Sequence, residues 1–129
     1  MKPDFEKVSN CVIRQNEHIT IFKQSSKEEL FGYLIEEMEE LREVLEKSDF
    51  DPIELESEVG DVAYLIIRLA NCCGVDLIEA ILSKISRNYH KYWKQETREE
   101  AKANWSHDKD HQFLSDWVDN YRTKVDNSK

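Results

Sequence analysis

The sequence contains few residues that interrupt helices and few that cross-link a chain. Its 129 residues include 3 glycines and 2 prolines, which favours long helices over an architecture of many strands and tight turns. The 3 cysteines are Cys11 and the adjacent pair Cys72 and Cys73, and this pattern does not make a disulfide framework. We expect the adjacent pair in the core and the protein in the reducing cytoplasm.

Long apolar runs and an excess of positive charge are also missing from the sequence. The longest apolar stretch is interrupted by Arg68 and Asn71, so it is too short to span a bilayer. The first ten residues show no apolar segment of a signal peptide. The formal net charge of −9 argues against a nucleic-acid backbone as partner. An acidic protein can still bind a polyanionic small molecule if cations lie between the two sets of negative charge.

The first half of the chain predicts two helices. Residues 4 to about 19 carry apolar side chains at loosely helical spacing, and residues 20–25 are predicted to be a connector. A second helix begins after Ser26, which can form a capping box with Glu29, and it runs to Lys47.

The third predicted helix is the most apolar segment of the chain. Asp51 is its expected N-cap, Pro52 suits its first turn, and Glu54 is expected to complete a second capping box. Residues 62–73 are apolar on nearly every side, as in the central element of a bundle. Gly74 is a natural position for the end of this helix.

A fourth helix is expected over residues 77–93, after a capping box of Asp76 and Glu79. A short fifth amphipathic helix is expected over residues 110–121. We therefore predict an all-α fold with a four-helix-bundle core and a short additional C-terminal helix.

Acidic residues gather on the second and third helices. Glu37 and Glu40 are three residues apart, as are Glu58 and Asp61, so each pair shares one side of its helix. Two antiparallel helices would bring the pairs face to face, where four carboxylates repel one another unless cations are present. Oxygen ligands without His or Cys suit Mg²⁺ or Mn²⁺. From the residues alone, a metal site and a solvated acidic surface both stay open, and Glu36 fits either.

The fourth predicted helix carries Lys84, Asn88 and Lys91 at the spacing i, i+4 and i+7. These groups share one side of the helix and could hold phosphate oxygens. A solvated end of the helix is the alternative.

The acidic pattern resembles the signature of the MazG-like all-α nucleoside triphosphate pyrophosphatases. It reads EExxE over residues 36–40 and, after seventeen residues, ExxD over residues 58–61. The resemblance covers residues 26–92 and is closest to the dCTP pyrophosphatase branch. Features typical of that branch are the V-D-L at 75–77 and the K-x-x-x-N-x-x-[RK]-Y ending at 84–92.

The resemblance implies hydrolysis of a nucleoside triphosphate to the monophosphate and pyrophosphate, serving nucleotide-pool clearance. It implies a catalytic domain over residues 1–93, followed by an extension over 94–129 whose role is open. It also implies a homodimer or homotetramer. The implied Mg²⁺ ligands are Glu37, Glu40, Glu58 and Asp61, with Mn²⁺ as an alternative ion. The implied catalytic residues are Glu36, Glu37 and Glu40, and the implied substrate-binding residues are Lys84, Asn88 and Lys91.

The chain departs from the dCTP branch ahead of the first acidic motif. That branch has Trp and a Phe-His pair there, whereas this chain has no Trp and places His18 before Phe22. The preferred base therefore stays open, with dUTPase-like and phosphoribosyl-ATP pyrophosphohydrolase-like enzymes as alternatives. A non-enzymatic helical interaction domain is a further alternative. A di-iron bundle would need Glu-x-x-His pairs, which this chain lacks.

Overall fold

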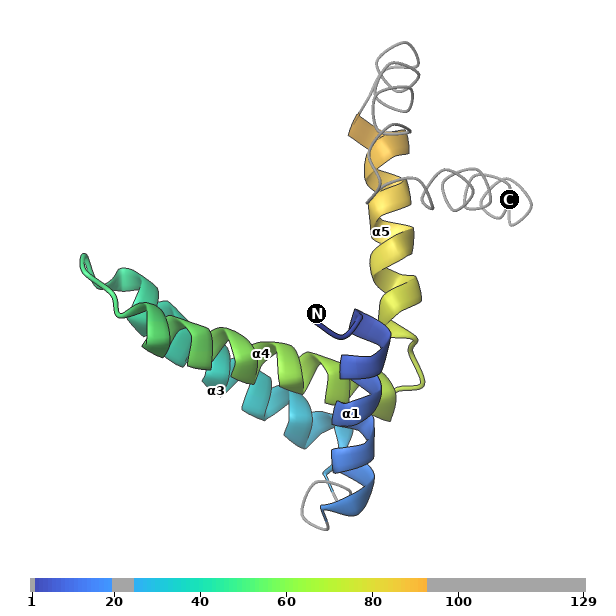
Figure 1. Cartoon of the computed structure of the whole chain (residues 1–129), viewed down its shortest axis with the longest axis horizontal. Helices are drawn as coiled ribbons and strands as arrows, with labels where there is room; N and C mark the ends of the chain where they lie inside the picture. Colours follow the sequence, from blue (N-terminus) through green and yellow to red (C-terminus); the bar gives the residue numbers. More distant parts are fainter. Residues whose placement is uncertain (1, 20–24, 93–129) are drawn as a thin grey trace. The chain divides into compact units, whose positions relative to one another are not determined.

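The computed structural model describes residues 2–19 and 25–92, the last four by their backbone alone, and most of these residues are helical (Figure 1). No strand occurs among them, which confirms the predicted all-α class. The helices are α1 (Phe5–His18), α3 (Lys27–Glu46), α4 (Pro52–Cys72) and α5 (Leu77–Tyr92). The fifth predicted helix lies outside the described residues.

The chain divides into two compact units, Met1–Leu77 and Ile78–Lys129, and each is considered by itself. The first unit holds α1, α3 and α4. The proposed boundary between a domain over residues 1–93 and an extension over residues 94–129 stays a prediction. Within the described ranges, no helix has both the length and the apolar character needed to cross a membrane.

Both helices that open the first unit start at a side-chain cap. Asp4 accepts a hydrogen bond from the Lys7 N–H at 2.9 Å and so begins α1. The predicted capping box is present at α3, because the Glu29 N–H donates to Ser26 Oγ at 3.1 Å and the Ser26 N–H donates to Glu29 Oε1 at 3.3 Å. Each cap satisfies N–H groups that the first turn of a helix leaves without a partner.

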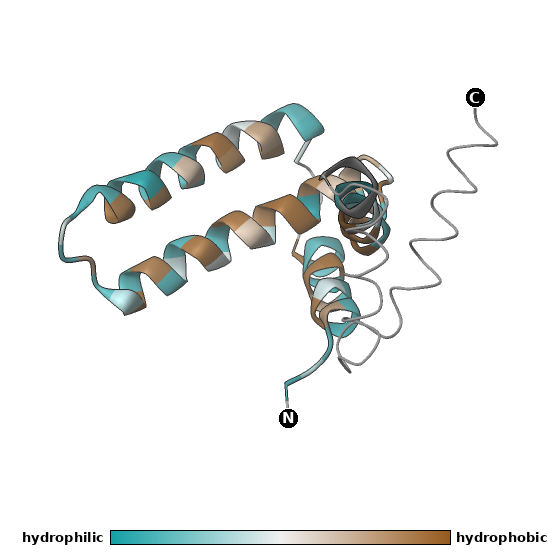
Figure 2. Ribbon diagram, turned by 90° about the horizontal axis from the view of Figure 1, so that it is seen from above, coloured by the Kyte–Doolittle hydropathy of each residue, from teal (hydrophilic) through white to brown (hydrophobic). Residues whose placement is uncertain are grey.

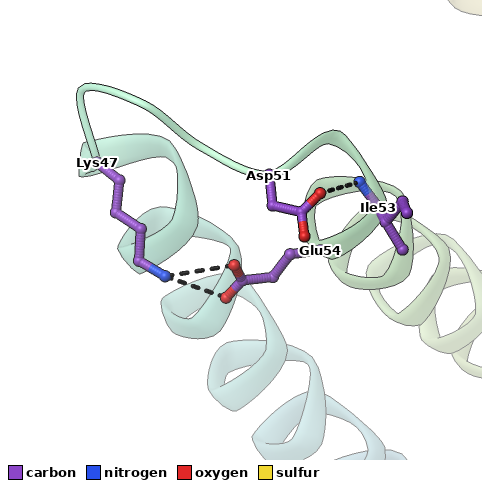
Figure 3. Close-up of polar contacts among 4 residues, drawn as sticks. All are labelled: Lys47, Asp51, Ile53 and Glu54. Atoms are coloured by element: carbon purple, nitrogen blue, oxygen red, sulfur yellow. Dashed lines mark hydrogen bonds and ion pairs between the residues drawn. The ribbon is translucent and has the colours of Figure 1, made fainter.

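The start of α4 corrects one prediction. Asp51 caps the helix through the Ile53 N–H at 3.0 Å, but Glu54 does not complete a capping box. Its carboxylate instead accepts hydrogen bonds from Lys47 Nζ at 3.1 and 3.3 Å (Figure 3). The turn between α3 and α4 brings the lysine within reach, and a charge-assisted bond is stronger than a bond to a neutral N–H.

Gly74 ends α4 as predicted. Its φ is +71°, in the left-handed region that glycine adopts without a Cβ penalty. The Gly74 N–H donates to the Asn71 carbonyl at 3.2 Å, and the Val75 N–H donates to the Ala70 carbonyl at 2.9 Å. This pair of bonds is a Schellman motif, and it satisfies two of the carbonyls at the helix end.

Helices α3 and α4 form an antiparallel hairpin, and apolar residues recur along both (Figure 2). Leu30 and Leu34 of α3 pack with Leu65 of α4, and Val62 and Leu69 pack against this cluster. Full burial of one leucine side chain contributes about 1.5–3 kcal/mol, so these contacts fix how the two helices face each other. Helix α1 packs on α4 and buries Ser9 and Val12.

Several large apolar side chains on α3 lie outside this core. Four of them, at the spacing i, i+4, i+7 and i+14, share one side of the helix, which we call the outer stripe. They are Phe31, Ile35, Met38 and Leu45, with exposed fractions of 54%, 48%, 53% and 54%. Cys72 and Cys73 are also exposed, so the expectation that they belong to the core is wrong for this chain.

Candidate active site

Four carboxylates converge between α3 and α4. Glu37 and Glu40 come from α3, and Glu58 and Asp61 come from α4. One oxygen from each residue can be chosen so that all four lie within 4.8 Å of one another. The hairpin therefore brings together the residues expected to hold a metal, because each pair shares one side of its helix and the leucine cluster packs the two helices against each other.

Two oxygens of this cluster are buried without a hydrogen-bond partner. They are Glu37 Oε2 and Glu58 Oε2. A buried polar atom without a partner is unfavourable, and a charged one is more so. The cluster is therefore unfavourable as an ionised group of four carboxylates by itself.

The surroundings shift the protonation of both glutamates. Burial, with added repulsion from Glu40, Asp61 and Glu58, raises the pKa of Glu37 to about 7. Burial also raises the pKa of Glu58, with added repulsion from Glu40 and Asp61. Both shifts have the same cause, since a carboxylate that leaves water and meets other carboxylates resists ionisation.

A divalent cation fits this donor set. All four groups are carboxylates, and hard oxygen donors suit Mg²⁺ and Mn²⁺. The buried oxygens of Glu37 and Glu58 lack a hydrogen-bond partner, and coordination would satisfy both while offsetting the repulsion within the cluster. The geometry therefore favours a metal site over a solvated acidic surface.

A cleft of about 340 Å³ opens beside the carboxylates. Glu37 and Asp61 of the cluster reach it, and Glu36 lines it next to them. The rest of its lining is mixed in character, with a leucine, two tyrosines, a serine and an arginine. These residues are Ser25, Tyr33, Tyr64, Leu65 and Arg68.

A comparison with protein families matches residues 25–93 to the MazG nucleotide pyrophosphohydrolase domain. The match covers more than half of the 129 residues. The chain belongs to the MazG family. No match emerges among curated proteins or among solved structures.

Membership of the MazG family confirms the resemblance seen in the sequence and the all-α fold class. It supports nucleoside triphosphate pyrophosphohydrolase activity in general, in an enzyme that acts on phosphoric anhydride bonds. Divalent-metal dependence is typical of the MazG family, and the carboxylate cluster agrees with it. Assignment to the dCTP pyrophosphatase branch stays a prediction.

The three predicted substrate-binding residues lie within the matched MazG segment. They belong to the second compact unit, whereas the carboxylate cluster belongs to the first. Lys84 and Asn88 are exposed on α5. Lys91 lies in the last turn of the same helix, where the description covers the backbone alone. Their part in substrate binding stays a prediction.

The sequence interpretation missed Tyr33, Tyr64 and Arg68 as residues of the MazG cleft. Tyr33 precedes Glu37 by four residues, and Arg68 follows Asp61 by seven, so helical spacing places each on the side of a carboxylate. An arginine inside an otherwise apolar run was the signal available in the sequence. A charged residue in such a run needs polar partners, but the sequence does not show which residues these are.

Proposed function

We propose that this MazG-family protein is a Mg²⁺-dependent nucleoside triphosphate pyrophosphohydrolase that converts a (d)NTP to the (d)NMP and pyrophosphate. The observation that carries the proposal is the cluster of four carboxylates, with two buried oxygens that lack partners, at the edge of a cleft. Such a cluster is suited to neutralising the negative charge of a triphosphate through cations.

In this proposal four residues would hold Mg²⁺, with Mn²⁺ as the alternative ion. They are Glu37, Glu40, Glu58 and Asp61. When bound, the ion supplies charge neutralisation at the triphosphate and lowers the pKa of a water molecule. A carboxylate of the chain would then accept a proton from that water molecule.

We propose that Glu36 accepts a proton during the reaction. It lines the cleft beside Glu37 and is exposed, so it can orient a water molecule and accept its proton. Glu37 and Glu40 complete the catalytic set that we propose on α3. Lys84, Asn88 and Lys91 would bind phosphate oxygens or the sugar, since cationic and amide groups donate hydrogen bonds to such acceptors.

We propose a cytoplasmic role in clearing unusual or surplus nucleotides. The cysteines Cys11, Cys72 and Cys73 are free and exposed, which fits a reducing compartment. A dUTPase-like or phosphoribosyl-ATP pyrophosphohydrolase-like activity would use the same carboxylate chemistry on another substrate.

We also propose that the protein assembles as a homodimer or homotetramer. The outer stripe of α3 supports this, because four large apolar side chains in a row are unfavourable in water. A second copy of the chain would cover them.

The test is pyrophosphate release from a panel of nucleotides with Mg²⁺, including dCTP, dUTP and phosphoribosyl-ATP. Release from a (d)NTP supports the proposal, and the preferred substrate separates it from the two enzymatic alternatives. No release from any nucleotide would contradict the proposed activity and favour a helical interaction domain.

A further inference from the structure

Arg68 is a buried cation at the cleft, with an exposed fraction of 4%. Its Nε–H donates to Asn16 Oδ1 at 3.0 Å, and its Nη2 donates to Ser25 Oγ at 3.4 Å. Two oxygen acceptors thus fix the plane of the guanidinium group. A buried arginine is costly without polar partners, and Arg68 is not one of the residues of the leucine cluster.

The cleft changes in character along α4. Asp61, Leu65 and Arg68 are spaced i, i+4 and i+7, so they share one side of the helix. The rise of about 1.5 Å per residue puts Arg68 roughly 10 Å from Asp61 along the axis. Tyr33 and Tyr64 line the same cleft. From Asp61 to Arg68 the cleft is therefore first acidic, then apolar and aromatic, and finally cationic. A nucleotide has matching parts in the same order, namely the triphosphate with its metal, the nucleoside, and the polar edge of the base.

Helix α1 bonds to residues that line this cleft, although α1 lies outside the matched family segment at residues 25–93. Asn16 of α1 accepts a hydrogen bond from Arg68, and Gln15 accepts one from the Tyr64 hydroxyl. Two residues of α1 therefore orient two residues that line the cleft.

We propose that Arg68 is a specificity residue that favours nucleotides whose base carries a carbonyl oxygen and disfavours adenine, and that Asn16 is its positioning residue. This inference rests on the proposed function. A guanidinium group has N–H donors and no acceptor. Guanine, hypoxanthine, cytosine, uracil and thymine offer an exocyclic carbonyl oxygen, whereas adenine presents an amino group instead. Such a residue would also protect the abundant ATP from hydrolysis.

The sharpest comparison is between ITP and ATP, two purine nucleotides that differ at position 6 by a carbonyl oxygen and an amino group. With Mg²⁺, the wild-type kcat/KM for ITP should exceed that for ATP by about tenfold to a hundredfold. Arg68→Met should remove this preference by raising the KM for ITP. The kcat/KM for ATP should change by less than about twofold. Arg68→Lys keeps the charge but not the planar fork, and it should also lose the preference.

Asn16 is tested by the replacement of its acceptor. Asn16→Leu should reduce the preference for ITP, and Asn16→Asp, which keeps an acceptor oxygen, should retain it. The matched controls are Arg14→Met and Asn10→Leu, which change exposed residues of α1. They should leave the kcat/KM for ITP and ATP unchanged. Thermal melts show whether each variant is folded, and Arg68→Lys serves if Arg68→Met is not.

Binding of α,β-methylene analogues of ITP and ATP, measured by calorimetry with Mg²⁺, separates this inference from the proposed function. An inactive wild type that still binds the ITP analogue more tightly through Arg68 overturns the proposed function alone. An active wild type that treats ITP and ATP alike overturns the inference alone. An equal decrease in kcat/KM for ITP and ATP in Arg68→Met also overturns the inference, because that pattern indicates a structural role for Arg68.

Discussion

Glu37 meets three other carboxylates and has one buried oxygen without a hydrogen-bond partner. Glu37→Gln keeps the volume of the side chain and removes its charge. We expect pyrophosphate release to fall by at least about a hundredfold, since loss of a metal ligand costs more than loss of a residue that supports one. We also expect the Mg²⁺-dependent rise in Tm of the wild type to disappear.

Glu43→Gln is the matched control for this prediction. Glu43 is exposed on the same helix and lies outside the cluster, so its variant should keep both the activity and the Mg²⁺ response. A Glu37→Gln protein that retains wild-type turnover would remove this residue from the site.

The raised pKa of Glu37 predicts how stability depends on pH without metal. The pKa rises from 4.5 to about 7 on folding, so between these values the folded protein holds a proton that the unfolded chain has released. Stability must then fall as pH increases through this window. In EDTA, we expect Tm to decrease from pH 5 to pH 7.5, and Glu37→Gln should flatten the decrease. An unchanged slope in the variant would contradict the assignment.

At the scale of the elements, the ends of the helices could be predicted where their causes are local. Ser26, Asp51 and Gly74 act within a few residues of their own helix, and the structure confirms each of them. Glu54 could not be predicted in the same way, because its partner Lys47 reaches it across a turn.

Gly74 provides a test of the end of α4. Gly74→Ala places a Cβ in open space but at a φ of +71°, so the strain of the left-handed backbone alone should lower the free energy of unfolding by about 1–2 kcal/mol. Gly60→Ala is the control, because Gly60 lies inside α4 with open space for a Cβ. It should increase stability by about 0.5–1 kcal/mol. Denaturant unfolding in EDTA measures the free energy of unfolding of both variants. A change of the same sign in the two would contradict this account.

The carboxylate cluster and the cleft differ in how far the sequence could predict them. Glu37, Glu40, Glu58 and Asp61 were predictable because helical spacing and one antiparallel hairpin suffice to gather them. The role of Arg68 in the cleft was not, because it depends on α1 packing against α4 and on bonds between residues about fifty positions apart in sequence.

For the whole molecule, the outer stripe of α3 makes a prediction about assembly. Phe31→Glu puts a charge on the outer stripe, a surface that we propose is covered by a second copy. We expect the wild type to elute as a dimer or tetramer and this variant as a monomer in size-exclusion chromatography with light scattering. Ile53→Glu, on α4 with an exposed fraction of 77%, is the control and should leave the assembly unchanged. A monomeric wild type at micromolar concentration would contradict the proposal.

The products of the reaction test the central claim most directly. Phosphorus NMR of the wild-type protein with Mg²⁺ and its preferred nucleoside triphosphate should show a nucleoside monophosphate and pyrophosphate in equal amounts. EDTA should abolish the reaction, since the carboxylate cluster then lacks the cation that neutralises the triphosphate. Formation of a nucleoside diphosphate and inorganic phosphate, or turnover that continues in EDTA, would contradict the account.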